Sequence, residues 1–272
     1  MKRDYFSIPF KKIILFFIRN SKHPLFLSYY LYYFWQNEFS VTASFFDEQE
    51  LLAFIQEGKS LIRIGDGEIG LLNDKGITGT VFLQRPLSIF KRKFKEMVST
   101  YHKESPYVLA IPKKYLSYHN KLLREEGKLR SWLPLKIMYI LIFPKGMKYA
   151  DSHIFYQPKF FEKNIVPIIK DRTVIFVINE TKVEALKQKN FTRKIYFVKT
   201  PPSDAGAKYI EIRKEIKEAL LLYSDENPIL LFSCGPIGKV LLYDFSLEGY
   251  QGIDVGEAAN VLYEDTRIDY LV

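Results

Sequence analysis

The sequence predicts an α/β protein with a Rossmann-like, mostly parallel sheet and helices on both faces. Amphipathic and short apolar segments alternate from residue 47 onward, as in chains that pass repeatedly from helix to strand. Two of the apolar runs, residues 173–178 and 228–233, are continuous rather than alternating, which is typical of strands buried on both faces. The chain has 272 residues, of which 47% are hydrophobic, and can therefore bury a full core.

The elements of the first half begin with a helix over residues 47–57, because Asp47 and the acids after it form a capping-type start to an amphipathic run. The short run 61–64 predicts a strand, and the basic amphipathic run 87–100 predicts a helix. Residues 107–111 predict a strand that Pro112 ends. Residues 116–142 and 160–170 are expected to be mainly helical.

The second half repeats the alternation more regularly. Apolar, β-branched runs predict strands, and amphipathic runs predict helices, the last of which ends at Gly249. The expected strands are 173–178, 194–198, 228–233 and 251–255, and the expected helices are 181–189, 207–223 and 237–248.

Residues 1–46 are predicted to form a basic, aromatic helical extension before the domain over residues 47–272. The apolar stretch 13–18 is too short to cross a bilayer, which takes about 20 residues, and no small-residue cleavage site suggests a signal peptide. Helices here would either lie in the membrane interface or pack on the core or a second subunit. Peripheral membrane contact through residues 1–40 and a homo-oligomer are both left open.

The composition narrows the class of partner. Forty Lys and Arg face 31 Asp and Glu, a net charge of +9, which favours acidic partners such as anionic lipid or phosphorylated substrates. No zinc finger, RNP motif or long basic tract is present, so nucleic acid is not expected. The single cysteine, Cys234, excludes an intramolecular disulfide and fits a cytoplasmic protein.

The segment Arg63-Ile-Gly65-Asp66-Gly67-Glu68 follows the first expected strand of the domain. If the backbone stays extended, the carboxylates of Asp66 and Glu68 point the same way, and the two glycines let a ligand approach closely. Hard carboxylate oxygens suit Mg²⁺ or Mn²⁺ carrying a diphosphate. A solvated acidic turn is the alternative. Arg63, in an otherwise apolar strand, should be paired if it is buried.

A second candidate loop, Ser233-Cys-Gly235-Pro236, joins an expected strand to a helix. Pro236 suits the first helical position, Gly235 allows close approach, and free N–H groups at the helix start favour phosphate. The alternative is an ordinary tight turn. Lys239 would either add positive charge to this loop or lie in solvent.

Four further residues at strand ends are candidates. Asn179 and Glu180 end a buried strand, where they would contact a nucleotide or serve the structure alone. Asp254 ends the last strand and Glu257 follows it, where an acid could bind substrate, act as a general base or cap a turn.

These segments resemble the GT-D type glycosyltransferases, a group first catalogued as a domain of unknown function. The resemblance rests on Arg-x-Gly-Asp-Gly-Glu at 63–68, on Gln84, on Cys-Gly-Pro at 234–236 and on Gly-Ile-Asp-Val-Gly at 252–256. It spans roughly residues 47–260. Family members often have His where this chain has Glu257.

The resemblance implies a metal-dependent transfer of a sugar from a nucleotide-diphosphate donor, expected to be a UDP-sugar, to a saccharide acceptor. Asp66 and Glu68 would hold Mn²⁺ or Mg²⁺, and Gln84 would belong to the same site. The expected role is synthesis of cell-surface polysaccharide or glycoprotein glycan, on an acceptor that could be lipid-linked at the inner face of the membrane. A metal-dependent phosphohydrolase and a non-catalytic membrane-associated binding protein are the alternatives.

Overall fold

The computed structural model describes residues 41–72, 87–156, 160–187 and 192–262. The described residues fall into two compact units. One contains residues 41–42 and 114–143, and the other contains residues 43–113 and 144–262 without the gaps. Most of the predicted N-terminal extension, including the segment 1–40 considered for membrane contact, lies outside the described residues.

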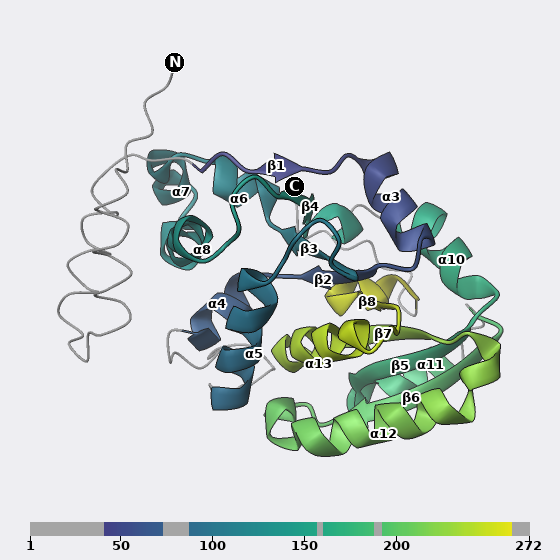
Figure 1. Ribbon diagram of the computed structural model, residues 1–272. Helices are drawn as coiled ribbons and strands as arrows, with labels where there is room; N and C mark the ends of the chain where they lie inside the picture. Colours follow the sequence, from purple (N-terminus) through teal and green to yellow (C-terminus); the bar gives the residue numbers. More distant parts are fainter. Residues whose placement is uncertain (1–40, 73–86, 157–159, 188–191, 263–272) are drawn as a thin grey trace. The chain divides into compact units, whose positions relative to one another are not determined.

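The larger unit is built on one eight-stranded sheet in the order β1-β4-β3-β2-β8-β7-β5-β6 (Figure 1). Every pair of neighbouring strands is parallel. The sequence prediction of a parallel α/β sheet is therefore confirmed. The strands are β1 (Ser44–Phe45), β2 (Ser60–Arg63), β3 (Tyr107–Ile111), β4 (Lys148–Asp151), β5 (Thr173–Asn179), β6 (Lys194–Thr200), β7 (Ile229–Ser233) and β8 (Gly252–Asp254).

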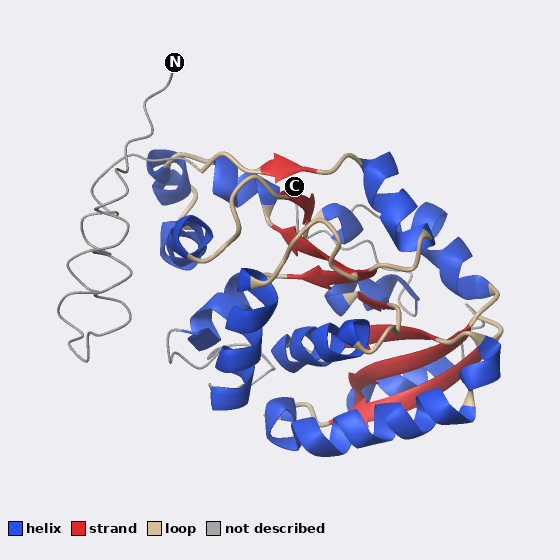
Figure 2. Cartoon of the chain, in the orientation of Figure 1, coloured by secondary structure: helices blue, strands red, loops and turns tan. Residues whose placement is uncertain are grey.

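Helices cover both faces of this sheet (Figure 2). One face packs against α3 (Glu48–Gln56), α10 (Val166–Lys170) and α11 (Val183–Lys187), whose apolar residues share a buried cluster with alternate residues of β5 and β7. The other face carries α5 (Ser88–Ser99) and α13 (Pro236–Leu247), with α12 (Tyr209–Leu222) beside α13. Burial on both faces explains why β5 and β7 consist of residues that are all buried.

Local signals set the ends of two helices as expected. In α3, Asp47 accepts the N–H of Glu50 at 2.8 Å while Glu50 accepts the N–H of Asp47 at 3.0 Å, forming a capping box. In α13, Pro236 occupies the first helical position, and Gly249 follows the helix with a φ of 89°. The predicted starts and stops of these helices are confirmed to within a residue or two.

The smaller unit contains α6 (Lys113–Ser117) from its second residue on, α7 (Asn120–Glu125) and α8 (Leu129–Leu141), where one mainly helical segment was expected. The rings of Tyr115 and Trp132 stack with centroids 4.4 Å apart. Lys136 is buried, and its Nζ donates to Asn120 Oδ1 at 3.2 Å. Over the described ranges, no helix is both long enough and apolar enough to cross a membrane.

The structure differs from the sequence prediction in two places that matter for the site. Strands β1 and β4 were not predicted, and β1 lies within the range assigned to the N-terminal extension. Asp66 and Glu68 do not continue an extended strand, because both belong to the first turn of helix α4 (Asp66–Leu72). The expectation that an extended backbone aligns the two carboxylates is therefore wrong.

Candidate functional site

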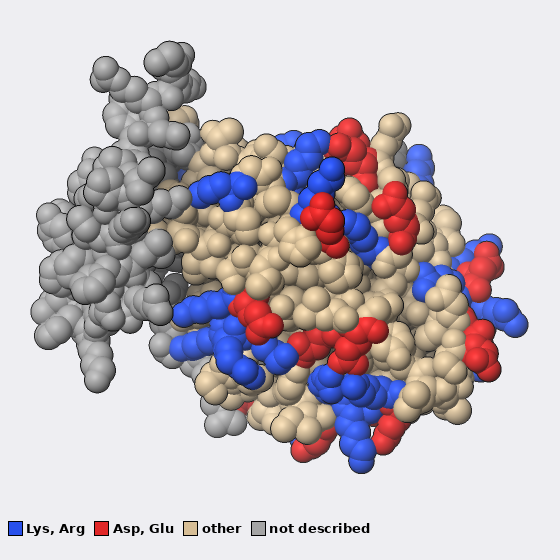
Figure 3. Space-filling view, in the orientation of Figure 1, with Lys and Arg blue, Asp and Glu red and all other residues tan. Residues whose placement is uncertain are grey.

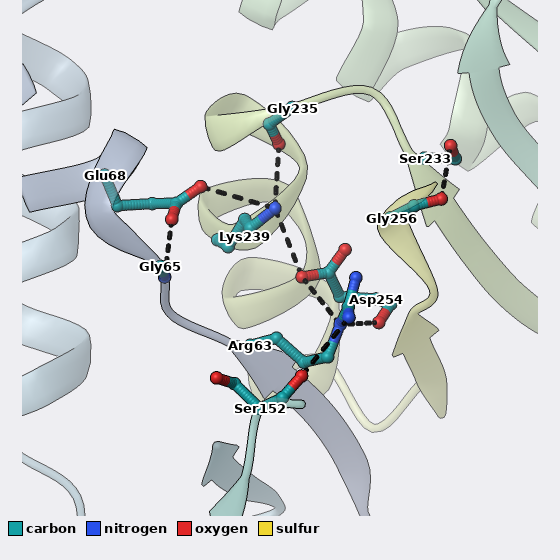
Figure 4. Close-up of polar contacts among 9 residues, drawn as sticks. All are labelled: Arg63, Gly65, Glu68, Ser152, Ser233, Gly235, Lys239, Asp254 and Gly256. Atoms are coloured by element: carbon teal, nitrogen blue, oxygen red, sulfur yellow. Dashed lines mark hydrogen bonds and ion pairs between the residues drawn. The ribbon is translucent and has the colours of Figure 1, made fainter. Parts of the chain in front are cut away.

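The carboxyl ends of β2, β8 and β7 are adjacent in the middle of the sheet, as is usual for ligand sites in open parallel sheets. The turn after β2 leads into α4, and the turn after β7 leads into α13. Four charged side chains from these elements converge there: Arg63, Glu68, Lys239 and Asp254 (Figure 4). We call these four residues the charge cluster. All four are at least nine-tenths buried, with exposed fractions of 2–8%.

Arg63 ends β2 and is paired, as its predicted burial requires. Its Nε donates to the carbonyl oxygen of Asp254 at 2.7 Å and lies 3.8 Å from Asp254 Oδ2. Its Nη1 donates to the carbonyl oxygen of Ser152 at 3.4 Å. The guanidinium also lies over the rings of Phe155 and Tyr156, at 5.3 and 5.5 Å from their centroids. These contacts fix the guanidinium between β2, β8 and the segment after β4.

Lys239 lies in the first turns of α13 and connects the two carboxylates of the cluster. Its Nζ is 3.2 Å from Asp254 Oδ2 and 3.4 Å from Glu68 Oε1. It also donates to the carbonyl oxygen of Gly235 at 3.4 Å. The second oxygen of Glu68, Oε2, accepts the N–H of Gly65 at 2.7 Å, so the turn after β2 is closed by its own carboxylate. From the sequence, Lys239 would either add positive charge to this loop or lie in solvent. In the structure its side chain is buried beside the loop.

The electrostatics of the cluster keep both cations charged. Burial alone would lower the pKa of the Lys239 ammonium, but the carboxylates of Asp254 and Glu68 outweigh burial and raise that pKa. Burial likewise opposes the charge on Arg63, and Asp254 outweighs it and raises the pKa of the guanidinium. Two positive and two negative side chains therefore form a buried group with balanced charges at the carboxyl ends of the central strands.

The turn between β7 and α13 is the second candidate loop of the sequence analysis. Gly235 precedes the helix with φ 72° and ψ −157°, a conformation that favours glycine, and the space beside its Cα is open. Pro236 is the first helical residue. Ser233, at the end of β7, donates its hydroxyl to the carbonyl oxygen of Gly256 at 2.8 Å. Ser233 thus ties the end of β7 to the turn after β8, and its hydroxyl proton is committed to that bond.

The structure brings together one group of predicted site residues and leaves another apart. The first group lies in or beside the charge cluster, at the carboxyl ends of β2, β7 and β8 and at the starts of α4 and α13. It consists of Arg63, Gly65, Gly67, Glu68, Ser233, Gly235, Pro236 and Asp254. Asn179 ends β5, further along the sheet, and Glu180 follows it. The Asn179 side chain caps its own turn by accepting the N–H of Thr181 at 3.0 Å, and Glu180 is exposed.

Three predicted residues need separate mention. Glu257 follows β8 and is exposed. Asp66 starts α4, but its side chain is outside what the structure describes, and Gln84 lies outside the described residues. Among the described side chains, no group of three or more His, Cys, Asp or Glu is arranged to hold a metal ion.

Comparison with known proteins identifies the family. A family model for the glycosyltransferase GT-D fold matches residues 61–265, which include every member of the charge cluster. No curated protein matches the sequence significantly.

Solved structures agree with that match at the level of the fold. A glycosyltransferase (DUF1792) from Streptococcus sanguinis has a TM-score of 0.63 at 23% identity, over 80% of this chain and 82% of that chain. A structure of domain of unknown function 1792, described as having a distinct glycosyltransferase fold, has a TM-score of 0.62 at 19% identity, over 79% of each chain. The family model covers most of the chain, including the central strands whose carboxyl ends carry the charge cluster. This protein therefore belongs to the GT-D family and is a glycosyltransferase.

Proposed function

We propose that this glycosyltransferase uses a nucleotide-diphosphate sugar, a UDP-sugar, and a divalent metal ion, and that its acceptor is a saccharide in a cell-surface polysaccharide or glycoprotein glycan. The observation that carries the proposal is the charge cluster beside the start of α13. Two buried cations, two carboxylates and a helix N-terminus lie together at the carboxyl ends of the strands, where ligands of parallel sheets bind.

The diphosphate of the donor matches the positive groups of this edge. Lys239 is buried and charged, and it lies on the helix whose N-terminal end carries the positive part of the helix dipole. The open space at Gly235 lets phosphate oxygens approach the backbone. Arg63 donates to the carbonyl oxygens of Asp254 and Ser152 and lies over two rings, so we assign it a positioning role.

The metal ion would be held by Asp66 and Glu68. Glu68 fits this role in its chemistry, because its carboxylate is a hard oxygen donor at the sheet edge and its orientation is fixed by Gly65 N–H. When bound, Mn²⁺ or Mg²⁺ would offset the negative charge that develops on the leaving diphosphate. Glu68 is paired with Lys239 in this structure, so a metal ion bound by Glu68 would compete with the ammonium of Lys239 for the same carboxylate.

An acceptor hydroxyl must lose a proton as it attacks the sugar. Of the two acids predicted for this task, Asp254 is 2% exposed and is paired with Arg63 and Lys239. Glu257 is exposed, three residues further along the same turn. We therefore propose Glu257 as the base and Asp254 as the group that positions the two cations.

The charge on the surface supports an anionic partner. Helix α5 carries Lys91, Arg92, Lys93 and Lys95, and Figure 3 shows basic side chains gathered over this helix. A lipid-diphosphate-linked acceptor at the inner face of the membrane, or the phosphates of the donor, would be attracted to such a patch.

Calorimetric titration with UDP and a panel of UDP-sugars, with and without Mn²⁺, tests this proposal. The wild type should bind UDP more tightly with Mn²⁺, and Asp66→Ala/Glu68→Ala should lose that dependence. Glu184→Ala is the matched control, because Glu184 is an exposed acid on α11 whose salt bridge is to Lys187. Absence of metal-dependent binding of any UDP compound would refute the UDP-sugar assignment.

Product analysis with the preferred donor separates the remaining alternatives. A transferase moves the sugar to an added saccharide acceptor and hydrolyses the donor slowly without one. Fast release of phosphate or free sugar that does not depend on acceptor would instead indicate a phosphohydrolase. Donor binding without turnover on any acceptor would indicate a binding protein.

A further inference from the structure

The ammonium of Lys239 lies between the carboxylates of Glu68 and Asp254. Three oxygens surround Nζ: Asp254 Oδ2 at 3.2 Å, Glu68 Oε1 at 3.4 Å and the Gly235 carbonyl at 3.4 Å. The side chain of Lys239 is 10% exposed, so solvent contributes little to its stabilisation. The lysine is therefore the internal counter-ion of both acids.

This position is unusual for a lysine because it is close to the N-terminal end of α13. The helix dipole is positive at that end and disfavours a cation. The carboxylates of Asp254 and Glu68, at 3.2 and 3.4 Å from Nζ, offset both the dipole and the burial of the charge. If another cation binds one of these two carboxylates, the ammonium loses a partner and can form an ion pair with an anion instead.

We propose that Lys239 changes partners during donor binding. Without metal, Lys239 neutralises Glu68. When Glu68 serves as a metal ligand, Lys239 gives up Glu68, stays on Asp254 and bonds a phosphate oxygen of the donor. This inference rests on the proposed function, in which Glu68 holds the metal and the donor is a nucleotide diphosphate.

The charge balance of the cluster gives the exchange a measurable consequence. Arg63 and Lys239 balance Glu68 and Asp254, so a divalent ion entering alone leaves excess positive charge in a buried site. A diphosphate offsets that excess. Metal and nucleotide should therefore strengthen each other's binding, and Lys239 should be the residue that couples them.

Lys239→Met tests the exchange, with Mn²⁺ binding measured by the loss of the free-ion EPR signal, with and without UDP. Without UDP, the variant should bind Mn²⁺ about tenfold more tightly than the wild type, because the competing cation is gone. UDP should then add little to Mn²⁺ affinity, and Mn²⁺ should raise the unfolding temperature of the variant more than that of the wild type. Lys239→Arg keeps the charge and should retain the coupling.

Lys214→Met is the matched control, because it also removes a positive charge, from a side chain on α12 that is 76% exposed. Its Mn²⁺ affinity should equal that of the wild type. If Lys239→Met fails to fold, Lys239→Gln, which removes the charge but keeps a hydrogen-bond donor, takes its place. Unchanged or weaker Mn²⁺ binding in the charge-free variant would overturn the exchange, provided that the wild type binds Mn²⁺ and Glu68→Ala does not. Absence of Mn²⁺ binding in the wild type and in every Lys239 variant would refute the metal-dependent function itself.

Discussion

The packing of Arg63 against Gly256 allows a sharp test of how the charge cluster is held. Gly256 follows β8 with a φ of 50°, and a Cβ placed on it would lie 2.0 Å from Nη2 and 3.3 Å from Cζ of Arg63. The tip of an arginine is usually free to move aside. Here it is bonded to the carbonyl oxygens of Asp254 and Ser152 and lies over aromatic rings, so it moves only by giving up those contacts.

The expected cost of Gly256→Ala has two parts. The left-handed backbone conformation costs roughly 1 kcal/mol for a residue with a side chain. Displacing the guanidinium weakens a charged hydrogen bond, worth about 2–3 kcal/mol in a buried setting. We therefore expect a loss of about 3–4 kcal/mol in the free energy of unfolding, which for a unit of this size lowers the unfolding temperature by roughly 10 °C.

Gly249→Ala provides a matched control in the same unit. Gly249 has a φ of 89°, and nothing lies within 4 Å of a Cβ placed there, so it tests the backbone cost alone. Chemical denaturation of both variants should show Gly249→Ala losing about 1 kcal/mol. Equal losses in the two variants would refute the argument that Arg63 is fixed, because the steric part of the cost would then be absent.

Two further predictions concern Cys234, at the turn before α13, and Asp244, within α13. Burial raises the pKa of the Cys234 thiol to about 12, so the native thiol should resist Ellman's reagent at pH 8 and react after denaturation. Burial of the protonated thiol stabilises the fold fully below the unfolded thiol pKa of about 8.5, and this stabilisation falls as the pH rises toward 12. Labelling of Cys234 in the native protein at the rate of the denatured protein would contradict the burial of the thiol. Asp244→Ala should cost about 2 kcal/mol in denaturant unfolding, because the buried carboxylate pairs with Lys93 of α5 and accepts from Tyr209 of α12. Glu184→Ala should change stability by less than about 0.5 kcal/mol, and equal effects of the two variants would argue against the network.

The sequence predicted the central strands well because their residues are buried on both faces. Each residue of β5 and β7 is buried, and short continuous runs of apolar, β-branched residues are typical of such strands. The edge strands carried no comparable signal, since β1 has two residues and β4 reads Lys-Tyr-Ala-Asp. Helix α4 was missed because Gly67 and Gly70 lower helix propensity and make the segment resemble a turn.

The candidate site was predicted in its parts but not in its arrangement. Parallel strands end at one edge, so the turns at Gly65, Ser233 and Asp254 could be assigned to that edge from sequence. Their adjacency depends on β8, the last strand of the chain, inserting between β2 and β7, where Leu61 pairs with Ile253. No local pattern encodes a contact of that sequence separation.

Lys239 shows why charged cluster members are hard to find from sequence. It lies in a helix whose residues from 236 to 246 are all buried, and a single lysine in such a run resembles a side chain that reaches solvent. Only the adjacency of β2 and β8 brings the carboxylates of Glu68 and Asp254 to its ammonium. The pairing of Arg63, by contrast, could be expected, because an arginine in an otherwise apolar strand should be paired if it is buried.

The energetics of buried charges predict that the charge cluster serves ligand binding more than stability. Burying four charges costs about as much as their mutual attraction returns, so replacing a whole buried cluster with apolar residues is often close to neutral. Removing one member is costly, because Lys239→Met alone leaves Glu68 and Asp254 without their shared cation. The fourfold variant Arg63→Met, Glu68→Leu, Lys239→Met, Asp254→Leu should therefore unfold within about 2 kcal/mol of the wild type, whereas Lys239→Met alone loses about 3 kcal/mol. Denaturant unfolding gives both values, and UDP titration should show no binding to the fourfold variant. A fourfold variant less stable than the single one would mean that the cluster is chiefly structural, and retained UDP binding would mean that the donor binds elsewhere.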